Sequence, residues 1–127
     1  MQRIFSSASF AVGAIMLSAS ALLTTAQAQD VNAGQQIFAE CAGCHEVTAT
    51  NGFGPGLLGI VGRKSASEPG FRYSAALQHA ELTWDVKNLN AFLTDPQKLV
   101  PGNLMPFPGM DDAQARADLI AYLQTVK

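Results

Sequence analysis

The residues Cys41-Ala42-Gly43-Cys44-His45 decide how this chain of 127 residues is interpreted. Cys41 and Cys44 are its two cysteines, and they are three positions apart. A disulfide between residues so close in sequence would close a very small loop and restrict little of the unfolded chain. The pair therefore needs an explanation other than a stabilising cross-link.

The spacing C-x-x-C-H is typical of covalent haem attachment. Cysteines one helical turn apart can add to the two vinyl groups on one edge of the porphyrin, and His45 then follows as an iron ligand under the ring. A structural zinc site needs four ligands, but the one further Cys or His in the chain is His79, at no zinc-module spacing. A thioredoxin-like dithiol would stand in a βαβ setting, for which the sequence shows no pattern. We therefore predict one haem c with its iron, and keep zinc and a redox dithiol as minor alternatives.

The sixth iron ligand decides between electron transfer and catalysis, because a substrate needs a vacant coordination position. Beyond residue 28 the candidates are Met105, Met110 and His79. Met105 lies in a loop made rigid by Pro101 and Pro106, and a thioether ligand favours reduced iron. We predict Met105 as the ligand, Met110 as a packing residue and His79 as a surface histidine.

The N-terminal residues 1–28 follow the order of a secretory signal peptide. Arg3 precedes an apolar run from Phe10 to Leu23, and Ala26-Gln27-Ala28 offers the small residues of a cleavage site. An uncleaved membrane anchor is the alternative, because the apolar run could almost span a bilayer. We expect residues 1–28 to be removed, and residues 29–127 to form one domain in the periplasm without stable membrane insertion.

The expected mature chain is mildly acidic. Arg3 is the one charged residue before position 29, which leaves seven Lys or Arg against ten Asp or Glu, a net charge of −3. Without a basic stripe, nucleic acid is not expected as a partner. The balance instead suits a partner with a basic or mixed surface.

Two segments in the first and middle parts of the chain have the apolar spacing of helices. The first is expected from Val31 to Ala42, with Asp30 or Asn32 as its N-cap. The second is expected over residues 85–93, before a short turn in which Pro96 takes the first helical position after Asp95.

A third helix is expected to begin at Asp111, which would act as its cap while Gln114 reaches back. Its expected buried side consists of Ala115, Leu119, Tyr122, Leu123 and Val126. The loops between the helices are long and rich in glycine and proline, and no segment alternates convincingly as a strand. So small a core would be completed by a large apolar cofactor.

Several groups of residues follow the haem motif or precede it in a characteristic order. They are Gly34-Gln35-Gln36-Ile37-Phe38, Gly54-Pro55-Gly56-Leu57, Gly62-Arg63-Lys64, Pro69-Gly70-Phe71 with Tyr73-Ser74, Thr83-Trp84, Phe92-Leu93-Thr94-Asp95-Pro96, Val100-Pro101-Gly102-Asn103-Leu104-Met105 and Asp118-Leu119-Ile120-Ala121-Tyr122-Leu123. Over residues 29–127 this series resembles the class I cytochromes c of the soluble bacterial and mitochondrial type. The resemblance implies an all-α fold in which the first and last helices cross and loops surround one covalently attached haem.

The resemblance also implies roles for individual residues. His45 would be the proximal ligand, with the Pro55 carbonyl accepting its other ring N–H, and Met105 the distal ligand. Arg63, Tyr73 and Trp84 would hold the haem propionates, although plain core packing is a second interpretation of Trp84. Gly34 and Phe38 would meet Leu119 and Tyr122 where the terminal helices cross.

The function that this resemblance implies is one-electron transport by a monomer that is not an enzyme. Donors and acceptors would be membrane cytochrome complexes, oxidases or periplasmic dehydrogenases. The alternatives are a haem subunit of one dehydrogenase or oxidase, and a peroxidase or gas sensor with an open iron position. Phe92, Leu77 and Leu104 replace residues common in the family (tyrosine, asparagine and lysine), which affects the expected potential and partner rather than haem binding.

Overall fold

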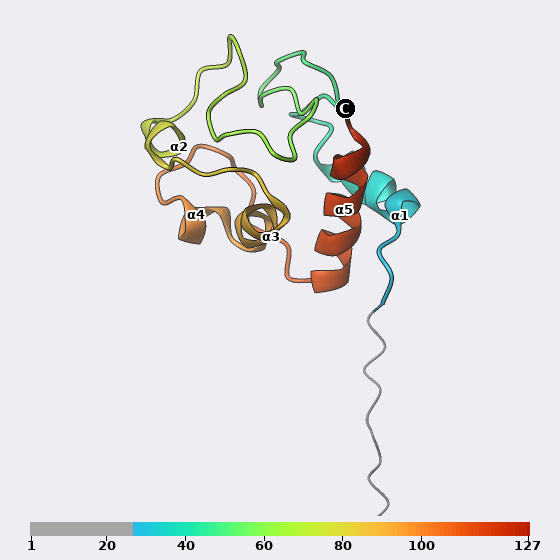
Figure 1. The fold of residues 1–127 in the computed structure, drawn as a ribbon. Coiled ribbons are helices and arrows are strands. Elements are labelled where there is room, and N and C mark those ends of the chain that lie inside the picture. Colours follow the sequence, from blue (N-terminus) through green and yellow to red (C-terminus); the bar gives the residue numbers. More distant parts are fainter. Residues whose placement is uncertain (1–26) are drawn as a thin grey trace, which may run out of the picture.

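The computed structural model describes residues 27–127, so nearly all of the expected signal peptide, residues 1–28, lies outside the described residues. Short helices alternate with long loops in this part of the chain (Figure 1). The elements are α1 (Val31–Ile37), the 3-10 turn η1 (Phe38–Glu40), α2 (Ala75–His79), α3 (Val86–Thr94), α4 (Pro96–Leu99) and α5 (Ala113–Thr125). Between residues 27 and 127 the one extended pairing is an isolated bridge between Lys64 and Thr83, which agrees with the all-α prediction. No helix within this range is long and apolar enough to cross a membrane.

Helices α1 and α5, far apart in the sequence, cross in direct contact (Figure 1). A Cβ added to Gly34 would lie 2.0 Å from the backbone oxygen of Asp118, so the approach requires glycine. Beside it the rings of Phe38 and Tyr122 pack with centroids 5.6 Å apart. The Asp118 carboxylate also accepts a hydrogen bond from the Asp30 N–H at 2.8 Å. The expected crossing at Gly34 and Phe38 is therefore present.

The first helix is shorter than expected, because α1 ends at Ile37 rather than Ala42. The chain tightens into η1, as helix ends often do, and then continues in turns. In these turns the N–H of Ala42 donates to the Phe38 carbonyl, and the N–H of His45 donates to the Cys41 carbonyl, each at 3.0 Å. At the start of α1 the cap is Asp30, one of the two candidates.

The cap of the last helix is Asp112, so the expectation of Asp111 is wrong. The Asp112 carboxylate accepts from the backbone N–H groups of Gln114 and Ala115. With Asp112 as the cap, Gln114 stands one position too early to reach back to it. Its side chain instead donates to the Asp118 carboxylate at 2.8 Å.

The buried side of α5 is broader than the expected stripe. Its buried residues are Arg116, Asp118, Leu119, Ile120, Ala121 and Leu123. Ala115 and Tyr122 are half-buried, and Val126 is buried just beyond the helix. Arg116 tolerates burial because its guanidinium donates to Asn90 and to the carbonyls of Met110 and Asp111.

The middle helices begin at polar caps. Asp85 caps α3. Asp95 caps α4, in which Pro96 takes the first helical position as expected. The short helix α2 is an element that the periodicity did not predict, since five residues are too few for a repeating pattern. Ser74 caps it by accepting from the Leu77 N–H.

Candidate haem site

A cavity of about 570 Å³ lies at the centre of the fold. Helices α3 and α5 contribute to its walls. The loops that carry Cys41 and Cys44, Arg63 and Arg72, and Met105 contribute as well. The aromatic and aliphatic side chains at its walls include Phe38, Leu57, Ile60, Phe71, Trp84, Leu89, Phe92, Leu93, Phe107, Leu119 and Leu123. A volume of this size is within the usual range of roughly 300–1,000 Å³ for a small-molecule site. The walls thus suit a large apolar group with a few polar contacts.

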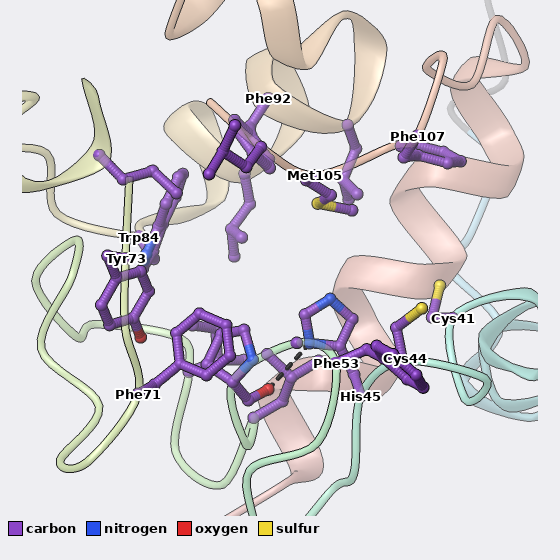
Figure 2. Close-up of a pocket in the computed structure, with 18 of the residues that line it drawn as sticks. Cys41, Cys44, His45, Phe53, Phe71, Tyr73, Trp84, Phe92, Met105 and Phe107 are labelled. Atoms are coloured by element: carbon purple, nitrogen blue, oxygen red, sulfur yellow. Dashed lines mark hydrogen bonds between the residues drawn. The ribbon is translucent and has the colours of Figure 1, made fainter. Parts of the chain in front are cut away.

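The loop that follows His45 fixes the orientation of the His45 ring. The carbonyl of Pro55 lies 2.8 Å from the Nδ1 atom of His45, and the other ring nitrogen points into the cavity (Figure 2). Gly54 packs against the ring, because a Cβ there would lie 2.5 Å from Cε1. A bond from Nδ1–H to a carbonyl fixes the tautomer in which Nε2 is free to bind a metal.

The two cysteines line the same end of the cavity as His45 (Figure 2). Cys41 is half-buried and Cys44 is exposed. Burial raises the pKa of the Cys41 thiol, and the nearby charges of Glu40 and Cys44 raise it further. Within residues 27–127 no group of three His, Cys, Asp or Glu side chains is placed so that it could hold a metal ion.

Met105 reaches the cavity from the side opposite His45, and its sulfur points toward the space between them (Figure 2). Its loop is held by Asn103, which is only 4% exposed. The Asn103 amide donates to the carbonyls of Pro96 and Val100 and accepts from the Met105 N–H at 3.0 Å. Asn103 is a positioning residue that the sequence reasoning missed, because an asparagine in a Pro-Gly loop is usually a turn residue.

The other two candidates for the sixth ligand do not line the cavity. Met110 packs, half-buried, against the core, and its N–H donates to the Leu93 carbonyl. His79 is exposed at the end of α2. Of the three candidates, the structure brings only Met105 to the cavity with His45.

Tyr73 and Trp84 line the end of the cavity away from the cysteines (Figure 2). Arg63 also lines the cavity, and its partner Glu68 donates a backbone hydrogen bond to the Tyr73 hydroxyl. The Arg63 guanidinium donates to the carbonyls of Leu58 and Gly56 and pairs with Glu68. Its Nε atom is buried without a partner, the one such side-chain atom in residues 27–127. Trp84 packs edge-on against Phe92, with ring centroids 5.0 Å apart.

Tyr73 completes this polar end. Its hydroxyl accepts from the Glu68 N–H at 3.2 Å, which leaves the hydroxyl hydrogen free to donate. Burial raises the pKa of the Tyr73 phenol, so the group stays protonated. An orphaned N–H and a free O–H at one end of an apolar cavity are what an amphipathic group with carboxylates at one edge needs.

Fold and cavity together define a small helical protein built around an apolar cavity, which a histidine and a methionine line from opposite sides. The sequence model of the family Cytochrome c matches residues 31–127, and the chain belongs to this family. It is 43% identical to cytochrome c2 of Rhodoblastus acidophilus over 102 residues, which cover 79% of this chain and 95% of that protein. It is 44% identical over 98 residues to cytochrome c of Sesamum indicum, covering 75% of this chain and 88% of the other.

A comparison with a solved structure also finds a cytochrome c. Cytochrome cH from Methylobacterium extorquens matches with a TM-score of 0.73 and 45% sequence identity, covering 76% of this chain and 98% of its own. The expected class I cytochrome c fold is confirmed, and so is one covalently bound haem c with its iron. The chain is thus an electron-carrying cytochrome.

Proposed function

We propose that this cytochrome is exported to the periplasm and carries single electrons between a donor and an acceptor protein as a monomer. Cys41 and Cys44 would bind the haem covalently, and His45 and Met105 would ligate its iron. The observation that carries the proposal is the position of these two ligands, which line the cavity from opposite sides (Figure 2). An iron that both residues ligate would leave no site for a substrate.

The remaining residues keep this site unchanged during electron transfer. When bound, the haem supplies an iron that changes its oxidation state by one electron. The Pro55 carbonyl fixes the His45 ring, and Asn103 fixes the loop of Met105. Phe92, which lines the cavity, has no hydroxyl to offer the methionine sulfur. The apolar walls exclude water, so little has to reorganise when the charge changes.

The haem subunit of one dehydrogenase or oxidase is the second candidate function. Phe53 and Leu104 line the cavity and are 92% and 79% exposed. Two exposed apolar side chains beside the cofactor favour a contact with a partner protein, because interface centres are depleted of charge. An acceptor or donor with an apolar patch would fit either version of the function.

The ligand assignment is tested by replacing each methionine. Oxidised wild-type protein should show the weak far-red sulfur-to-iron absorption band, and Met105→Ala should abolish it, lower the potential and allow carbon monoxide to bind. Met110→Ala is the matched control and should keep the band. Ready binding of carbon monoxide to the wild type would overturn the proposal in favour of a peroxidase or sensor.

Export is tested on the protein recovered from a native host. Mass spectrometry of the periplasmic fraction should give a chain that begins at Gln29 and carries the mass of one haem. An intact N-terminus in the membrane fraction would show an anchor instead.

A further inference from the structure

Glu68 is a buried acidic residue that neither attaches the haem nor ligates its iron in the proposed function. It is 9% exposed, and with Asn103, Arg116 and Asp118 it is among the buried polar residues of the described chain. The other three hold a loop or a helix end through several hydrogen bonds. The Glu68 carboxylate pairs with Arg63, and the backbone N–H of Glu68 donates to the Tyr73 hydroxyl. Both partners line the cavity, so Glu68 stands directly behind its polar end.

Arg63 therefore both pairs with Glu68 and lines the cavity. A guanidinium has five N–H donors in a fixed plane. One terminal nitrogen donates to Glu68 and to the Leu58 carbonyl, the other to the Gly56 carbonyl at 2.9 Å, and Nε remains without a partner. The carbonyls hold the plane in place, and the carboxylate compensates its charge. Arg63 thus lines the cavity without a full uncompensated positive charge.

We propose that Glu68 sets the reduction potential of this cytochrome by compensating the charge of Arg63 at the propionate end of the haem cavity. This inference rests on the proposed function and on the expectation that Arg63 holds a haem propionate. A negative charge near the haem opposes the addition of an electron, so Glu68 holds the potential lower than an uncompensated Arg63 would. Because the pair is buried, salt screens this effect less than it screens a surface charge. Glu68 acts through Arg63 and is a positioning residue.

Glu68→Gln removes the charge while keeping the shape and an oxygen that can accept from Arg63. The midpoint potential of the purified holoprotein, measured by spectroelectrochemistry, should rise. We expect a change of about threefold or more in the equilibrium constant of electron exchange, which is ~28 mV at about 59 mV per tenfold for one electron. Glu81→Gln makes the same chemical change at an exposed position and should leave the potential nearly unaltered. Glu68→Ala, which removes the same charge, serves if Glu68→Gln does not accumulate and should shift the potential the same way.

The route through Arg63 is tested by a double substitution. In an Arg63→Gln background, Glu68→Gln should move the potential much less than in the wild type, because a buried carboxylate without its partner cation is itself unfavourable. A shift of unchanged size there would overturn the role of Arg63. If wild-type protein shows a reversible one-electron wave and the far-red band, the proposed function stands. An unchanged potential in Glu68→Gln then overturns this inference alone, even if the variant is less stable, since a merely structural role would alter stability only.

Discussion

Replacing Gly34 by alanine tests the crossing of α1 and α5, where the two helices touch through backbone atoms. The new Cβ would lie 2.0 Å from the backbone oxygen of Asp118, 2.6 Å from its carbonyl carbon and 2.9 Å from the Tyr122 Cβ. Ordinary contacts begin near 3.4 Å. None of the three atoms belongs to the end of a flexible side chain, so the helices themselves must separate.

The expected cost follows from two opposing terms. Overpacking a well-filled interface costs typically about 1–3 kcal/mol, and the backbone obstacle puts this site at the upper end. Alanine recovers about 1 kcal/mol through its higher helix propensity. The net loss in the free energy of unfolding should therefore be about 2 kcal/mol. For a domain of this size that corresponds to a decrease in melting temperature of roughly 8–16 °C.

The measurement is denaturant unfolding of the holoprotein followed by circular dichroism, with wild type and variant compared at equal slope. Gly52→Ala is the matched control, because its added Cβ would meet nothing nearer than the Cys44 carbonyl oxygen at 3.4 Å. A Gly34→Ala protein whose unfolding free energy lies within about 0.5 kcal/mol of the wild type would refute the reasoning.

Two further perturbations probe the site. Because burial raises the pKa of Tyr73, the folded state keeps a proton that the unfolded chain loses near pH 10, so the free energy of unfolding should fall as pH rises above about 10. Tyr73→Phe should flatten that alkaline fall in a pH series of denaturant titrations, and a fall of equal steepness would contradict it. Gly54→Ala should displace the His45 ring, altering the haem spectrum and costing about 1–3 kcal/mol of stability, since the added Cβ meets three ring atoms. Gly43→Ala, with no atom within 4 Å of its added Cβ, is the control and should keep both spectrum and stability.

The parts of the site that local sequence encodes could be predicted from the chain alone. Cys41, Cys44 and His45 lie within five residues, so their common position at the cavity follows from a single turn. Met105 could be singled out because prolines restrict its loop. The cofactor and the fold class followed from the same motifs and are confirmed. The individual roles of these residues stay predictions.

The contacts that depend on how the loops turn and pack could not be predicted in this way. The pairing of Arg63 with Glu68 requires the chain to turn back on itself between them, and no periodicity encodes that turn. The observed cap of α5, Asp112, lies one residue after the predicted cap, Asp111. Two adjacent aspartates offer the same capping chemistry, and only the packing of the helix determines which of them is the cap. The burial of Asn103 depends on three hydrogen bonds of its side chain, which form only when the loop around it is folded.

The crossing of α1 and α5 also determines when this protein can finish folding. Asp30 and Asp118, whose hydrogen bond joins the two helices, are 88 positions apart, so this contact closes a very large loop. A chain that emerges N-terminus first exposes its cysteine segment long before α5 is available to pack against it. Haem attachment therefore has an interval in which Cys41 and Cys44 are accessible on an open chain. Late formation of this long-range contact separates cofactor insertion from final assembly.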